Sequence, residues 1–72
     1  MDEIRINYLG RGEGKLGKAL EYHAFEACIG YSHDTYYVTS LDDAWDKFEN
    51  ASSEKMRIIY SAIIQEFLDE TF

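Results

Sequence analysis

The side chains that could act as nucleophiles or bind a metal are His23, Cys28, His33 and Asp34. A thiol next to an imidazole can be activated as a nucleophile, and Cys, His and Asp all ligate zinc. The spacing of these residues, however, matches no standard zinc pattern, and no segment stands out as one that would build a pocket. Turn chemistry accounts for His33 and Asp34, and a place on the surface of a sheet accounts for His23. The sequence therefore predicts no metal, no cofactor and no enzyme activity.

A glycine-rich segment matches two phosphate-binding patterns. Residues 12–17 fit G-x-G-x-x-G, and residues 12–18 fit G-x-x-x-x-G-K. Ala19 stands where the second pattern needs a Ser or Thr to hold magnesium, and 72 residues leave no room for the parallel sheet that both patterns require. A flexible loop over residues 10–17 is the better interpretation.

The carboxylates give the strongest indication of a function. Residues 1–33 carry five acids and four bases, and residues 34–72 carry nine acids and three bases, so −6 of the formal net charge of −7 lies in the second half. This balance argues against direct nucleic-acid binding, which needs clustered Lys and Arg. It favours a basic partner instead.

A helix would arrange these acids in rows. Carboxylates four residues apart on a helix lie about 5–6 Å apart at Cβ, a spacing comparable to that of phosphates along a nucleic-acid strand. Such a row can occupy a groove made for DNA or RNA, whereas the alternative interpretation is an ordinary solvated acidic face. The candidate partner-binding residues are Asp42, Asp43, Asp46, Glu49, Glu54, Glu66, Asp69 and Glu70.

The segment that holds the first of these acids predicts a short capped helix. Ser40 and Asp43 form a capping pair three positions apart. The apolar residues that follow recur at i, i+3, i+4 and i+7, as on one helical face: Leu41, Ala44, Trp45 and Phe48. We therefore expect Trp45 to be largely buried in the core.

A second helix is predicted to begin after residues 50–53, capped by Ser52 or Ser53. Its main apolar stripe consists of Met56, Ile59, Tyr60, Ile63 and Phe67. The stripe is widened by Ile58, Ala62, Ile64 and Leu68. This apolar face is broader than a small sheet can cover, which predicts self-association as a homodimer. A single bent helix over residues 41–70 is the alternative.

Three segments are candidate strands. Residues 4–9 alternate between apolar and polar side chains, and residues 35–39 are rich in β-branched and aromatic types. Residues 19–31 fit either a helix that ends at Gly30 or a strand. The strand is favoured because two strands alone are weakly stable, and residues 32–34 then form a hairpin turn. The prediction is a single α+β domain over residues 1–72, with a three-stranded antiparallel sheet followed by two helices packed on one face.

One stretch is similar to a known family. The sequence IRINYLGR at residues 4–11, followed by EGKLG at residues 13–17, resembles the opening of ArdA-type antirestriction proteins. These proteins begin with an alternating strand, a Leu-Gly-basic step, a glycine loop that contains Glu-Gly-x-Leu, and a second strand. They are acidic DNA mimics from plasmids and transposons that block restriction enzymes. The resemblance implies a small inhibitor from a phage or mobile element, a class that includes many anti-CRISPR proteins, and it carries over no functional residue.

The remaining features predict a cytosolic protein. No apolar segment follows Met1, so we expect no signal peptide. No apolar run is long enough to span a bilayer, and the single Cys28 permits no disulfide within the chain. Two functions are then expected. The first is a non-enzymatic inhibitor of a host nucleic-acid-binding defence complex, and the second is a small dimerising structural or regulatory interaction module.

Overall fold

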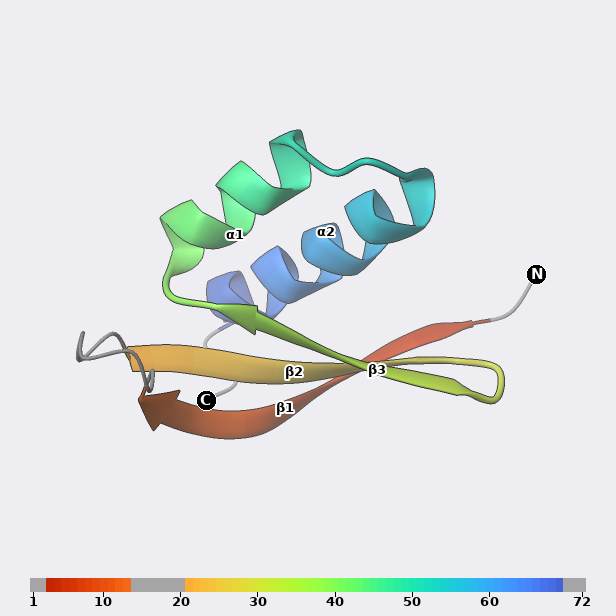
Figure 1. The fold of residues 1–72 in the computed structure, drawn as a ribbon, viewed down its shortest axis with the longest axis horizontal. Coiled ribbons are helices and arrows are strands. Elements are labelled where there is room, and N and C mark those ends of the chain that lie inside the picture. Colours follow the sequence, from red (N-terminus) through yellow and green to blue (C-terminus); the bar gives the residue numbers. More distant parts are fainter. Residues whose placement is uncertain (1–2, 14–20, 70–72) are drawn as a thin grey trace.

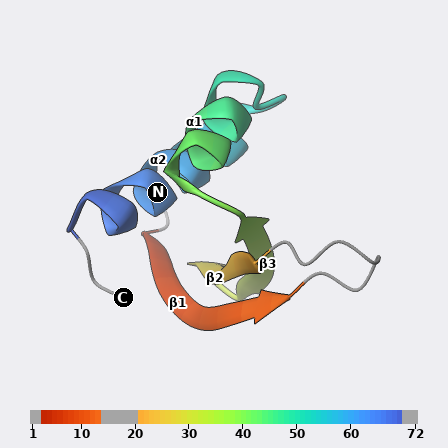
Figure 2. The same ribbon diagram turned by 90° about the vertical axis from the view of Figure 1, so that its left-hand side faces the viewer.

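The computed structural model describes residues 3–13 and 21–69, which form three strands and then two helices (Figure 1). The elements are β1 (Ile4–Glu13), β2 (Glu21–Ile29), β3 (Ser32–Val38), α1 (Leu41–Glu49) and α2 (Glu54–Asp69). The strands make one antiparallel sheet in the order β1-β2-β3. Both helices lie on the same side of this sheet in the two views (Figures 1 and 2). The predicted α+β fold is therefore confirmed, including the strand at β2, and the bent-helix alternative is wrong.

The core lies between the sheet and the two helices. β2 contributes Phe25 and Ala27, which alternate with outward-facing neighbours as the pleat requires. α2 packs against β1, and α1 packs against β3 and α2. The core cluster comprises Phe25, Ala27, Val38, Ala44, Ile59, Tyr60, Ile63 and Ile64. Because all of these residues are apolar or aromatic, burial of apolar surface is what holds the helices on the sheet.

β1 continues further than the alternation at residues 4–9 predicts. The strand runs through Gly10 and Gly12 to Glu13, so the predicted loop is wrong at these two glycines. A bulge interrupts the pairing between Tyr8 and Gly10, where Gly10 adopts a φ of 131° that other residues rarely reach. Gly12 lies under the ring of Tyr22, which occupies the space of a Cβ. The rest of the phosphate-binding patterns falls in residues 14–19, outside the described residues.

The hairpin between β2 and β3 turns earlier than predicted. Gly30 and Tyr31 make the turn, with Ile29 paired to Ser32, so the predicted turn at residues 32–34 is wrong. Gly30 has a φ of 58°, the left-handed conformation that glycine tolerates in tight hairpins. As a result, residues 32–34 belong to β3 and are paired with β2.

Both helices begin where the sequence predicts. α1 is capped by Ser40, whose Oγ accepts from the Asp43 N–H at 3.1 Å. α2 is capped by Ser53, whose Oγ accepts from the Met56 N–H at 3.2 Å. Neither α1 nor α2, as far as the structure describes them, has the length and apolarity needed to cross a membrane.

Candidate functional site

α1 presents a row of three carboxylates on its outer side. Asp42, Asp46 and Glu49 are all exposed. Ala44, on the opposite side of the helix, is fully buried. Since an α-helix turns by 3.6 residues, the spacing of the three acids keeps them on one side of α1. We call Asp42, Asp46 and Glu49 the acidic row.

Both lysines of the described residues are paired with carboxylates outside the acidic row. The Nζ of Lys47 lies 2.6 Å from Oδ2 of Asp43, and the Nζ of Lys55 lies 3.9 Å from Oδ2 of Asp34 on β3. Within residues 3–13 and 21–69, no ion pair involves a member of the acidic row. No lysine, arginine or histidine of the described residues therefore neutralises these three carboxylates through an ion pair.

Asp43 is a capping residue and does not belong to the row. Its Oδ2 accepts from the backbone N–H of Thr39 at 2.9 Å and from Lys47 Nζ at 2.6 Å. Burial alone would raise the pKa of Asp43, but the hydrogen bonds from Lys47 and Thr39 outweigh this effect and hold the pKa below its ordinary value of 3.8. This carboxylate, one of the candidate binding residues, is thus occupied in fixing the start of α1.

We expect Asp43→Ala to lower the free energy of unfolding by about 1 kcal/mol at neutral pH, because it removes a capping acceptor and an ion pair. The pKa of Asp43 is lower in the folded chain than in the unfolded chain, so its contribution is present above pH 3.8 and is lost as the pH falls through the folded-state value. Urea denaturation should therefore show a deficit at neutral pH that disappears well below pH 3.8. Asp42→Ala, in the same helical turn, is the matched control and should cost less. A deficit that persists at low pH would contradict this role.

The remaining candidate acids are more dispersed. Glu54 and Asp69 are exposed at opposite ends of α2, roughly 20 Å apart for a helix of 16 residues. Asp69 accepts a hydrogen bond from Gln65 at 2.9 Å. Glu66 is half-buried, and Glu70 lies outside the described residues. The acidic row on α1 is therefore the compact part of the predicted surface.

Trp45 is 44% exposed, so the prediction that it is largely buried is wrong. Its ring meets Phe48 edge-on, with the ring centroids 5.7 Å apart. The small side chain of Ala44 is the centre of the buried face, and Trp45 lies about 100° further round the helix. Trp45 therefore lies at the margin between the core and the acidic row, a position that the apolar periodicity of residues 41–48 does not predict.

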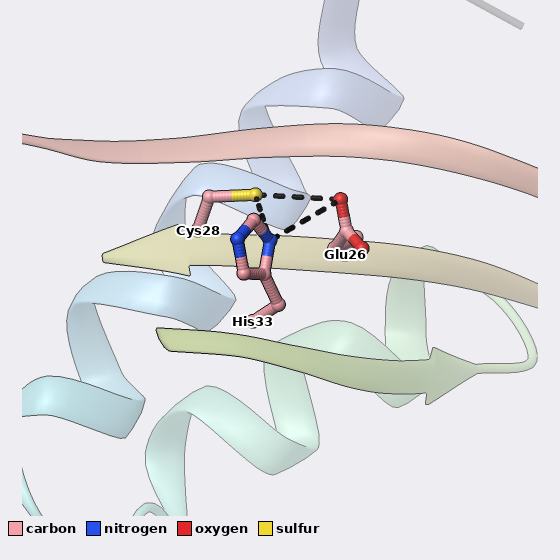
Figure 3. A group of neighbouring side chains, drawn as sticks. All are labelled: Glu26, Cys28 and His33. Atoms are coloured by element: carbon pink, nitrogen blue, oxygen red, sulfur yellow. Dashed lines mark hydrogen bonds and ion pairs between the residues drawn. The ribbon is translucent and has the colours of Figure 1, made fainter. Parts of the chain in front are cut away.

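A second group of side chains lies on the sheet face that the helices leave uncovered. Cys28 Sγ is 3.3 Å from Oε1 of Glu26 and 3.2 Å from Nδ1 of His33 (Figure 3). Burial, and then the hydrogen bond to Glu26, raises the pKa of the Cys28 thiol. The structure thus brings together Cys28 and one of the two predicted histidines, with a carboxylate that the sequence analysis did not consider.

The other two residues from the predicted set lie elsewhere. His23 faces the helices, where its Nδ1 is 3.0 Å from the Tyr8 hydroxyl and its ring meets Phe67 of α2. The prediction placed His23 on the surface of the sheet without choosing a face, and the structure puts its half-buried side chain on the face that the helices cover. Asp34 is near Lys55, on the side of β3 opposite to His33.

No protein-family model, no curated protein and no solved structure matches this chain.

Proposed function

We propose that this protein is a non-enzymatic inhibitor that binds a basic nucleic-acid-binding protein or complex. It would occupy the groove in which that target binds DNA or RNA. The observation that carries the proposal is the acidic row, three exposed carboxylates on one side of a capped helix. Asp42 and Asp46 are four residues apart and Glu49 follows three residues later, so neighbouring members lie about 5–6 Å apart at Cβ, a spacing that suits a surface that binds successive phosphates. Attraction to a basic groove would also speed association and select against acidic partners.

Trp45 offers an apolar contact that the three carboxylates of the acidic row cannot provide. Binding energy at protein interfaces is concentrated in a few residues, among which Trp is enriched, and a surrounding polar rim excludes water from them. Trp45 is exposed beside the acidic row and is positioned against Phe48. It would insert as an apolar anchor while the carboxylates meet the basic groups around it.

The target class follows from the resemblance to ArdA-type proteins at residues 4–11 and 13–17. It favours a host defence complex, of the restriction or CRISPR type, as the basic partner of a phage or mobile-element inhibitor. The protein would then act in the cytoplasm of the host cell and would bind neither nucleic acid nor a membrane directly.

A second function is favoured by a different observation. Ile58 and Leu68 of α2 are 44% and 58% exposed, although both belong to the widened apolar stripe. Exposed apolar side chains of this kind are suited to self-association or to a partner helix. A dimerising structural or regulatory interaction module is therefore the alternative.

The proposal is tested by competition between the protein and labelled nucleic acid for candidate basic defence complexes. We expect the protein to displace the nucleic acid and its apparent affinity to fall steeply as salt is added, because exposed charges are screened over about 8–10 Å at physiological ionic strength. Binding that is insensitive to salt would reject the acidic row as the contact. Failure to bind any such complex would reject the inhibitor and leave the interaction module.

A further inference from the structure

Glu26, Cys28 and His33 converge on the face of the sheet that the helices leave uncovered (Figure 3). Glu26 and Cys28 are two residues apart on β2, so the pleat points both side chains to the same face. His33 lies directly opposite Cys28 on β3. β2 is the central strand and is paired on both sides, so the backbone that carries Glu26 and Cys28 is fixed by two ladders.

The distances within the group fit a tetrahedral metal. Zinc binds Cys sulfur at about 2.3 Å and His nitrogen or carboxylate oxygen at about 2.0–2.2 Å, which places neighbouring ligand atoms about 3.3–3.6 Å apart. In the structure, Cys28 Sγ lies 3.2 Å from His33 Nδ1 and 3.3 Å from Glu26 Oε1. The third distance, from His33 Nδ1 to Glu26 Oε1, is 3.9 Å. Small rotations of the exposed His33 and half-buried Glu26 side chains would therefore complete the geometry.

We propose that Glu26, Cys28 and His33 form a zinc-binding site with three protein ligands and a fourth position open to water. The inference is independent of the proposed function, because the acidic row contributes nothing to it. It assigns the three side chains a role that neither the acidic row nor the core requires.

The donor set selects the metal. A thiolate and an imidazole suit zinc, whereas calcium and magnesium prefer oxygen ligands throughout. One thiolate and one carboxylate would balance the two positive charges of the ion, with His33 as a neutral ligand. The thiol proton, which Cys28 now donates to Glu26, leaves to solvent when the sulfur binds zinc.

The surroundings of the sulfur support this arrangement. The amide Nδ2 of Asn7, on β1, is 3.9 Å from Cys28 Sγ, so a donor from this neighbouring strand approaches the sulfur as outer-shell groups do in metal sites. Cys28 is 9% exposed whereas His33 is exposed, so an ion can enter from the open side while the sulfur is shielded. Zinc bound here would join β2 to β3.

The test is a titration of the reduced full chain with zinc chloride against a chromophoric chelator, together with a cobalt titration read by absorbance. We expect one ion per chain, a higher melting temperature in the presence of zinc, and cobalt spectra with thiolate charge-transfer and tetrahedral bands. Cys28→Ser, His33→Gln and Glu26→Gln should each weaken zinc binding by about tenfold to a hundredfold or more. Asp34→Asn, next to His33 on the other face, is the matched control and should bind as the parent does.

Circular dichroism without zinc identifies any variant that fails to fold. If Cys28→Ser fails to fold, the decision rests on the two variants at more exposed positions, His33 and Glu26. Absence of thiolate-to-cobalt absorption, zinc binding that survives all three substitutions, or an equal loss in Asp34→Asn would each overturn the site.

Discussion

Replacing Phe25 by Ala should lower the free energy of unfolding by about 3–5 kcal/mol. The Phe25 side chain has no exposed surface, and its ring packs against those of Tyr8 on β1 and Phe67 on α2, with centroids 5.2 Å and 5.9 Å away. Its removal therefore leaves a cavity where the sheet meets α2. A core in a chain this short rarely supplies more than about 3–5 kcal/mol, so we expect the variant to be largely unfolded in the absence of stabilising ligands.

The matched control for this prediction is Trp45→Ala, which truncates a larger ring. Trp45 is 44% exposed and its ring meets that of Phe48, so its removal should cost about 1 kcal/mol or less, within the range of ordinary surface sites and ring pairs. Urea denaturation followed by circular dichroism measures both variants, since the chain has a single Trp and its fluorescence is lost in the control. Equal losses in the two variants would show that Phe25 is not the centre of the core.

Reversing the acidic row, with Asp42, Asp46 and Glu49 all changed to Lys, should abolish competition with nucleic acid. The three changes convert the proposed contact from anionic to cationic and shift the formal net charge from −7 to −1. All three positions are exposed and face away from Ala44, so the fold should be retained. Lys in the first turn of α1 opposes the helix dipole and should cost no more than about 1 kcal/mol.

A second triple variant separates the surface from the total charge. Glu3, Glu21 and Asp34 are exposed on the sheet half of the molecule, and changing them to Lys gives the same net charge. Glu21 and Asp34 each lose an exposed ion pair, an interaction worth about 0–1 kcal/mol. This control should still inhibit. A folded variant of the acidic row that inhibits as the parent does would reject the row, and equal losses in the two variants would assign the effect to net charge.

The sequence predicts which strands and helices form better than it predicts the turns between them and the register of strand pairing. The alternation of Phe25, Ala27 and Ile29 correctly indicates β2, but its extension to Tyr31 moves the expected turn past the true one at Gly30. Tyr31 lies in the turn and is fully exposed. The sequence-based prediction therefore places His33 in the turn, whereas in the structure His33 belongs to β3. The cross-strand register, which alone places His33 opposite Cys28, depends on where the chain turns and is not encoded in spacing along one strand.

The position of Trp45 was missed for a related reason. An apolar stripe on a helix is more than 100° wide, so several residues can serve as its centre. In α1 the centre is Ala44, whose small side chain permits close approach to α2, and Trp45 is displaced to the edge. The outer position of Asp42, Asp46 and Glu49, by contrast, follows directly from helical periodicity, and the sequence predicts it.

The bulge in β1 also constrains how the length of this chain can vary during evolution. Before the bulge, even-numbered residues such as Ile6 pair with core residues of β2. Beyond the bulge, the even-numbered Gly10 and Gly12 pair with β2 residues whose side chains lie on the opposite face. A one-residue insertion or deletion elsewhere in β1 would exchange the faces of every residue beyond it. Leu9, at the bulge and 54% exposed, is the residue whose deletion would leave the pairings of Tyr8 and Gly10 with consecutive residues of β2 in place.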